Sequence, residues 1–277
     1  MNNREQRKLI AQDTLKILDQ GFYQTSSGER IDIASHQKHA ETNTKLYSPK
    51  LSDELLEQRI AQPNSTETKF LVKHATTLDA VRHLIKEGKS NVICLNFASA
   101  KNPGGGFLGG SQAQEESIAR STGLHNCQMN AWEYYEVNRN TKSCIYTDYM
   151  IYSPDVPILK NEEGVNLDQL NLVSIITAPA VNFGVVKNRE PEKSHLVEGI
   201  MKRRIAKVLA IALEYGHQYI VLGAWGCGVF QNDPSDVAKW FREVIEEQFK
   251  DEFLEIVFAV FSRDEKFIRA FYEGFGK

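Results

Sequence analysis

Residues 92–116 read VICLNFASAKNPGGGFLGGSQAQEE. The stretch opens with a largely apolar run over 92–98, which is typical of a buried strand. It continues into a loop with five glycines in the seven positions 104–110. Glycine lets the backbone approach a bulky anion closely, at a cost of about 0.5–1 kcal/mol per residue in regular structure. Because two adjacent carboxylates, Glu115 and Glu116, follow the loop, the pattern favours a phosphate-bearing substrate that is cleaved by acid–base chemistry.

Strands and helices alternate on both sides of this stretch. Strands are predicted at 69–72, 145–152, 172–178, 219–224 and 256–261, and helices at 77–87, 114–122, 127–137, 193–215, 235–249 and 264–273. Earlier residues predict helices at 4–19, 36–46 and 52–61 and a hairpin at 22–33. Mostly apolar strands between helices indicate a sheet that is covered on both faces. We therefore expect an α/β fold with three α/β/α layers, in which an N-terminal helical extension (1–65) packs on a core (66–277).

The composition indicates an ordinary globular protein of 277 residues, with 42% hydrophobic and 25% charged residues. A formal net charge of −3 does not favour general nucleic-acid binding. No apolar run has the length of a membrane helix, and the N-terminal charges lack the apolar segment of a signal peptide. The cysteines show no CxxC spacing, which suits a reducing, cytoplasmic location: Cys94, Cys127, Cys144 and Cys227.

The glycine loop also matches the dinucleotide-binding pattern GxGxxG through Gly104, Gly106 and Gly109. A dinucleotide-binding turn is tight and its helix begins within the glycines, whereas here Pro103 precedes the loop and Ser111 continues it. A phosphate-binding P-loop needs a lysine and a hydroxyl residue after the glycines, and both are missing. The pattern therefore argues against an NAD- or ATP-binding fold.

The two glutamates can be interpreted either as solvated surface residues without a catalytic role or as functional residues. Paired solvated glutamates are common at a helix start, where they complement the helix dipole. Neighbouring helical residues point about 100° apart, so Glu115 and Glu116 are poorly placed to straddle one bond. A division of labour suits them better, with one orienting a substrate hydroxyl and the other transferring a proton. The helix start should lower the pKa of both, while mutual repulsion and a nearby diphosphate should raise the pKa of one.

A second glycine loop, GAWGCGVFQN at 223–232, follows another predicted strand and resembles a backbone nest for anions. Both glycine loops are expected at the carboxyl edge of the sheet, where such folds bind ligands. Phe230 could pack against a ribose or base, or simply fill the core. Cys227 has no nearby histidine partner, so we interpret it as a bystander rather than a nucleophile.

Two further clusters are interpreted without function. The helix at 193–215 carries basic residues that we expect on a solvated face: Lys202, Arg203, Arg204 and Lys207. His36 and His39 lie close together but lack a recognisable third ligand, so no metal site is predicted.

The run NFASAKNPGGG at 96–106, followed after seven residues by Gln114-Glu115-Glu116, resembles the signature of poly(ADP-ribose) glycohydrolases. That signature consists of three glycines, a spacer of six to eight residues and Gln-Glu-Glu. The N-terminal helices resemble the compact bacterial or microbial type. The similarity covers about residues 5–275, with the specific motifs confined to 96–120 and 223–232.

The resemblance implies a macrodomain fold that binds ADP-ribose or poly(ADP-ribose) between the two loops. We expect a monomer that needs no cofactor. It makes Glu116 the catalytic acid/base, Glu115 the residue that bonds a ribose hydroxyl, and Gln114 a support for the loop. It places the reacting ribose against Asn102, Gly104, Gly105 and Gly106. It places the diphosphate against Gly226, Cys227, Gly228 and Val229. Phe230 would pack on the distal ribose. The adenine-contacting positions carry no motif.

The implied activity is hydrolysis of the ribose–ribose bond of poly(ADP-ribose). Two alternatives stay open at this point. A non-catalytic ADP-ribose-binding macrodomain needs the loops but not the glutamates. A hydrolase of mono-ADP-ribosyl conjugates could use the same acid and the same cleft. The sequence also leaves open whether cleavage occurs at chain ends or internally.

Overall fold

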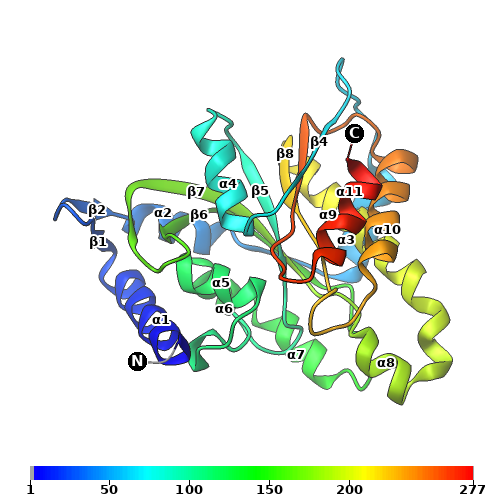
Figure 1. The fold of residues 1–277 in the computed structure, drawn as a ribbon, viewed down its shortest axis with the longest axis horizontal. Coiled ribbons are helices and arrows are strands. Elements are labelled where there is room, and N and C mark those ends of the chain that lie inside the picture. Colours follow the sequence, from blue (N-terminus) through cyan, green and yellow to red (C-terminus); the bar gives the residue numbers. More distant parts are fainter. Residues whose placement is uncertain (1–2, 277) are drawn as a thin grey trace.

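A mixed sheet of seven strands runs through the middle of the described part of the chain, residues 3–276 of a computed structural model (Figure 1). Its order is β3 (Lys45–Tyr47), β6 (Met150–Lys160), β7 (Asn166–Ala178), β5 (Val92–Phe97), β8 (Tyr219–Leu222), β9 (Glu255–Ala259) and β4 (Lys69–Lys73). The strands from β7 to β4 are parallel, whereas β6 is antiparallel to both β3 and β7. β5, which leads into the first glycine loop, is therefore the central strand.

Helices cover both faces of the sheet (Figure 1). One layer comprises α3 (Pro49–Gln58), α9 (Val197–Glu214), α10 (Pro234–Gln248) and α11 (Glu265–Phe275). The other comprises α2 (Ala34–Asn43), α4 (Thr77–Lys86), α5 (Gln114–Ser121) and α6 (Leu124–Asn130). Alternate side chains of β5 serve the two layers, since Ile93 and Leu95 join one apolar cluster and Val92 and Cys94 the other. The predicted three-layer α/β fold is confirmed.

The remaining elements lie at the edges of these layers. They are α1 (Asn3–Gln20), α7 (Trp132–Asn140), α8 (Phe183–Arg189), the hairpin strands β1 (Phe22–Gln24) and β2 (Arg30–Asp32), and the short 3₁₀ helices η1 (Phe107–Gly109) and η2 (Pro191–Leu196). Among the described helices, none combines the length and the apolar character needed to cross a bilayer.

The N-terminal residues are joined to the rest of the molecule at two places. β3 extends the main sheet by pairing with β6. On α1, Ala11 is buried in one small apolar cluster with Phe107 of the glycine loop and Ala119 of α5. The N-terminal segment is therefore continuous with the core through both a strand and a helix, and the division at residue 65 stays a prediction.

The structure differs from the sequence-based elements at several places; for example, the strand expected at 172–178 begins at Asn166, and the helix expected at 193–215 begins at Val197 after η2. The helix expected at 36–46 ends at Asn43, because the next residues form β3. The helix expected at 127–137 is two helices that meet at Ala131. The strand expected at 145–152 begins only at Met150, because the carbonyls of Ile145 and Tyr146 accept hydrogen bonds from Arg204 instead of a neighbouring strand.

The basic cluster of α9 was wrongly expected on a solvated face. Arg203 does lie partly exposed, but the side chains of Arg204 and Lys207 are fully buried, and all three cations contact the carboxylate of Asp148. Burial alone raises the pKa of Asp148, but the arginines outweigh it and hold that pKa at about 2. A buried cation needs such a partner, so α9 is tied through this cluster to the segment before β6.

Candidate active site

Both glycine loops lie at the carboxyl edge of the sheet, as predicted. β5 and β8 are parallel neighbours, and their pairing runs only from Val92 to Cys94 on β5. Beyond that point the two strands separate, and each continues into its own glycine-rich segment. Parallel sheets bind ligands at such openings between neighbouring strands.

The Gln114 side chain hydrogen-bonds to the end of β5, beyond the last residue that pairs with β8. Its Nε2 donates to the carbonyl of Leu95 at 2.7 Å, and its Oε1 accepts from the N–H of Phe97 at 2.8 Å. The amide thus satisfies one strand donor and one strand acceptor that would otherwise lie unpaired. A third bond, to Thr77 Oγ1 at 3.0 Å, links it to α4. These bonds fix the start of α5, and with it both glutamates, against the central strand.

The first glycine loop presses its backbone against both carboxylates. Gly105 has a φ of +59°, and a Cβ there would lie 2.5 Å from Glu116 Oε1 and 3.1 Å from Glu115 Oε2. Only glycine fits this position, because any side chain would combine a strained backbone with a clash. The next N–H, of Gly106, donates to Glu116 Oε1 at 3.0 Å.

Glu115 is a buried carboxyl group with three donors. Its oxygens accept from the N–H of Ser99 at 2.6 Å, from Asn96 Nδ2 at 3.1 Å and from Gln128 Nε2 at 3.1 Å. Burial is the main influence and raises the pKa of Glu115 to about 8, although these bonds favour the charged form. The charge of Glu116 adds a smaller increase. The expected lowering at the helix start is therefore wrong for Glu115, because desolvation outweighs it.

Glu116 differs from its neighbour in exposure and in partners. Its side chain is half-buried at the loop, and its Oε1 accepts a hydrogen bond from the N–H of Gly106. The interpretation of the two glutamates as a solvated surface pair is therefore wrong for Glu115, which is buried. It also does not fit Glu116, which is half-buried. The two carboxylates form an unequal pair, because Glu115 is buried among three donors and Glu116 is partly exposed beside the loop.

The second loop is closed by a single side chain. Asn232 Nδ2 donates to the carbonyl of Val181 at 2.9 Å and to that of Gly226 at 3.0 Å. Within residues 3–276, the N–H groups of Gly228, Val229 and Phe230 donate no hydrogen bond, so they are available to a ligand. The N–H of Cys227 is not, since it donates to the carbonyl of Ala224 at 3.1 Å.

The two side chains singled out in this loop have different environments. The Cys227 thiol is buried, which raises its pKa well above the ordinary value and makes it a poor nucleophile. Phe230 is partly buried, and its ring lies tilted against Tyr146 with the centroids 6.0 Å apart. Across the described residues, no three His, Cys, Asp or Glu side chains gather into a group that could hold a metal ion.

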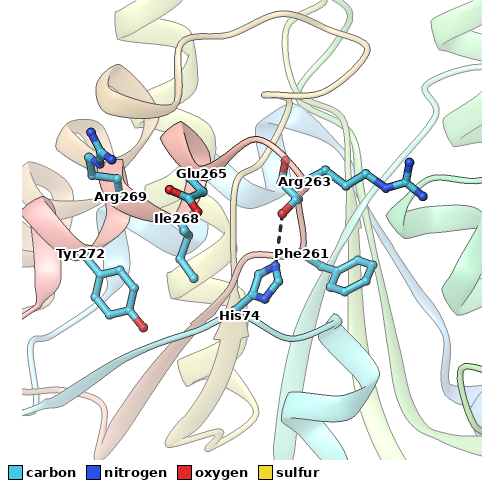
Figure 2. A pocket seen from close by; sticks show the side chains of 8 residues that line it. His74, Phe261, Arg263, Glu265, Ile268, Arg269 and Tyr272 are labelled. Atoms are coloured by element: carbon cyan, nitrogen blue, oxygen red, sulfur yellow. Dashed lines mark hydrogen bonds between the residues drawn. The ribbon is translucent and has the colours of Figure 1, made fainter.

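A cavity of about 800 Å³ lies farther along the same edge, where β4 and β9 end (Figure 2). The rings of His74 and Phe261 stack at 5.6 Å on one side, and Ile268 and Tyr272 of α11 contribute to the other (Figure 2). His74 Nε2 lies 3.1 Å from the carbonyl of Ser262. The residues that line this cavity belong to neither glycine loop.

The structure places both predicted glycine loops at one edge of the sheet, and it adds several supporting residues that the sequence did not predict. Asn102 is exposed at the loop start, where its Oδ1 accepts from Arg139 at 3.4 Å. The missed residues are Asn96, Gln128, Asn232, His74 and Phe261. A polar Asn96 within an otherwise apolar strand was a visible signal for a buried polar partner. The others belong to distant segments and carried no local pattern.

Comparison with known proteins identifies the family. Residues 11–161 match the family model described as the catalytic domain of microbial-type PARG, the poly(ADP-ribose) glycohydrolases. The solved poly(ADP-ribose) glycohydrolase of Thermomonospora curvata is 38% identical, with a TM-score of 0.94 over 97% of this chain and 99% of that one. A structure of that enzyme bound to the inhibitor ADP-HPD has a TM-score of 0.89, 38% identity, and coverage of 96% and 98%.

A second bacterial enzyme agrees. The Deinococcus radiodurans poly(ADP-ribose) glycohydrolase in complex with ADP-ribose is 41% identical, with a TM-score of 0.82 over 86% of this chain and 96% of that one. No curated protein matched. On these similarities, the chain belongs to the microbial-type poly(ADP-ribose) glycohydrolase family.

Proposed function

We propose that this protein hydrolyses the ribose–ribose O-glycosidic bond of poly(ADP-ribose) and releases ADP-ribose. The observation that carries the proposal is the contact between Gly105–Gly106 and the unequal pair Glu115 and Glu116, at the edge where ligands of such sheets bind. Family membership supports the same reaction, and related structures contain ADP-ribose or ADP-HPD.

Glu116 is assigned as the proton-transfer group. As the bond between the reacting ribose and the leaving ribose oxygen breaks, Glu116 donates its proton to that oxygen while positive charge develops on the reacting ring. The resulting carboxylate then takes a proton from the attacking water, which restores the acid. The Gly106 N–H, 3.0 Å from Glu116 Oε1, holds the carboxyl group in place through both half-reactions.

Glu115 is assigned to hold the reacting ribose, whose bond to the leaving oxygen breaks as Glu116 donates its proton. Its carboxyl group is fixed from below by Ser99, Asn96 and Gln128, so it can present an oxygen to a ribose hydroxyl at little entropic cost. With a pKa near 8, it is largely protonated at neutral pH and can also donate a hydrogen bond. Two adjacent negative charges are thereby avoided in the site.

The order of the strands suggests how the ligand lies. Along β5, β8, β9 and β4 the edge presents first the glutamates, then the free N–H groups of Gly228 to Phe230, then the aromatic cavity of His74 and Phe261. ADP-ribose has the same sequence of groups: a ribose, a diphosphate and an adenosine. We assign the diphosphate to the second loop, with Phe230 on the distal ribose, and the adenine to the cavity, where it could stack on an exposed ring.

Glu116→Gln tests the proposal most directly. Loss of one proton-transfer group costs about 10²–10⁴-fold in rate, so kcat on purified polymer should fall by that factor while calorimetry still detects ADP-ribose binding. Glu136→Gln, an exposed glutamate on α7, is the matched control. Near-native turnover by Glu116→Gln would refute the assignment. A wild-type protein that binds ADP-ribose but cleaves only mono-ADP-ribosyl conjugates, or nothing, would favour the corresponding alternative.

We further propose that the protein works as a monomer in the cytoplasm. All of its cysteines, Cys94, Cys127, Cys144 and Cys227, are free thiols in the structure, which fits a reducing compartment. Sedimentation of the purified protein would test the oligomeric state.

A further inference from the structure

The backbone of the first glycine loop is held from outside by arginines. Four carbonyl groups in and next to this loop accept a guanidinium N–H, in the pairs Lys101–Arg139 (2.7 Å), Gly109–Arg4 (2.9 Å), Gly110–Arg7 (2.8 Å) and Ser111–Arg120 (2.7 Å). These arginines come from α7, α1 and α5. A stretch rich in glycine has many accessible conformations, so ordering it requires strong contacts, and hydrogen bonds from a charged donor are among the strongest.

α1 supplies two of the four bonds. Arg4 and Arg7 are three residues apart, so they project from one face of the helix onto two consecutive carbonyls, of Gly109 and Gly110. The helix approaches so closely that a Cβ on Gly110, which has a φ of +74°, would collide with the carbonyl oxygen of Arg4. Figure 1 shows α1 alongside α5, the helix that carries the glutamates.

A short chain of bonds connects these carbonyls to Glu116. The N–H groups of Gly109 and Ser111 donate to the carbonyl of Gly106 at 3.0 and 3.2 Å. Across the same residue, the Gly106 N–H donates to Glu116 Oε1 at 3.0 Å. Gly106 therefore links the two: its carbonyl accepts from Gly109 and Ser111 and its N–H donates to Glu116, so the position of the Glu116 carboxyl group depends on where Gly109 and Gly110 are held.

α1 also reaches the other end of α5. Thr14, which is buried, donates through Oγ1 to the carbonyl of Arg120, one turn beyond Glu116. The guanidinium of Arg120 in turn donates to Ser111 at the end of the loop. α1 thus contacts both the loop and the helix between which Glu116 lies.

We infer that Arg4 and Arg7 are positioning residues for Glu116: they fix the end of the glycine loop so that the Gly106 N–H holds the proton-transfer group. The inference rests on the proposed function of Glu116. It predicts a selective effect on turnover, because the free N–H groups assigned to the diphosphate lie on the second loop, which neither arginine contacts.

The competing explanation is that α1 only stabilises the fold. Ile17 and Leu18 of α1 are buried in an apolar cluster with Leu159 of β6. Removing the whole helix would therefore disturb folding whatever the arginines do. The test therefore changes only the two side chains, in Arg4→Gln/Arg7→Gln. The control is Lys16→Gln/Lys38→Gln, which removes two exposed cations from the same N-terminal region.

Steady-state kinetics on poly(ADP-ribose) should show kcat reduced about tenfold or more in the arginine variant, since small displacements of a catalytic group have large effects on rate. The Kd for ADP-ribose should change less than threefold, and the control should match wild type in both. Arg4→Lys/Arg7→Lys, which keeps the charge and one donor per residue, should recover part of the loss. Equal kcat in the arginine variant and the control would overturn the inference, as would parallel losses of kcat, affinity and thermal stability.

Hydrogen exchange of the amides of residues 104–112 provides a second readout that does not require activity. Exchange there should be faster in the arginine variant than in the control, while exchange at 226–232 stays unchanged. If wild type cleaves no ADP-ribosyl substrate, the proposed function fails, but this comparison still decides whether the arginines order the loop. Unchanged exchange in an active enzyme would refute the positioning role alone.

Discussion

The two glycine loops follow neighbouring parallel strands, yet they are built in opposite ways. The first is fastened by guanidinium groups from three helices, and its Gly106 N–H is used to hold Glu116. The second is fastened by Asn232, and its N–H groups at 228–230 remain open. A proton-transfer group must be fixed before the substrate arrives, whereas an anion site needs unpaired donors. With the roles proposed for the two loops, glycine content alone does not distinguish a catalytic loop from a binding loop.

The largest effect should come from Gly105→Ala, which attacks the first loop directly. A methyl group there would strain a φ of +59° and clash with Glu116 Oε1, so the carboxyl group must move. We expect kcat to fall about 10²–10⁴-fold, as for loss of the acid itself, with ADP-ribose binding weakened much less. Steady-state kinetics and calorimetry measure the two quantities.

Gly28→Ala is the matched control for this substitution. Gly28 also has a positive φ, of +85°, but a Cβ there would meet nothing within 4 Å. It separates backbone strain from displacement of the glutamates. If Gly105→Ala retained kcat within a few-fold, the close fit of the first loop would have no catalytic meaning and the contrast between the loops would disappear.

Glu115→Gln should produce a pH-dependent change in stability of up to about 5 kcal/mol, at about 1.4 kcal/mol per pKa unit. The pKa of Glu115 is raised from 4.5 to about 8 in the fold, so its contribution is fully present below pH 4.5 and is lost as pH rises to 8. Glutamine cannot ionise and avoids this loss. The free energy of unfolding of the variant, relative to that of wild type, should therefore rise between pH 5 and 8. The difference should stay constant above pH 8.

Urea unfolding at several pH values between 5 and 9 measures this difference. Glu136→Gln, which removes an exposed carboxylate, should show no such growth with pH. A flat difference for Glu115→Gln would mean that Glu115 ionises at an ordinary pH in the folded protein. Glu115 would then be hydrated beneath the first loop, and the contrast between the two loops would be weaker.

The local signals in the sequence predicted the strand, loop and helix around residues 92–116, because apolar runs and glycines act over short distances. The burial of Glu115 could not be predicted in the same way. It depends on Gln128, from a helix that the sequence merged with the next one, and on Asn96, whose polar side chain lies inside the central strand. The pKa shift follows from that burial, so its cause was assigned to the wrong influence.

The misplaced cations of α9 and the missed cavity have the same origin. Arg204 and Lys207 looked solvated because their partner, Asp148, lies far away in the chain. His74 and Phe261 come from the ends of two strands that only the sheet order brings together. Periodicity describes one element at a time, whereas these features arise from contacts between elements.

The smallest effect should come from Asn232→Ala, which attacks the second loop. It removes the bonds from Nδ2 to Val181 and Gly226, each worth about 0.5–1.5 kcal/mol, so ADP-ribose affinity should fall about tenfold as the N–H groups at 228–230 lose their fixed direction. Asn171→Ala is the control, since that amide donates to the carbonyl of Gln169, two residues away, and to no other group among residues 3–276. At saturating polymer, kcat should stay within about threefold of wild type, because Glu116 and its support are untouched. This is the reverse of the expectation for Gly105→Ala. Should Asn232→Ala instead lower kcat and leave affinity unchanged, the second loop would act on chemistry, and the separation of fixed acid from open anion site would be wrong.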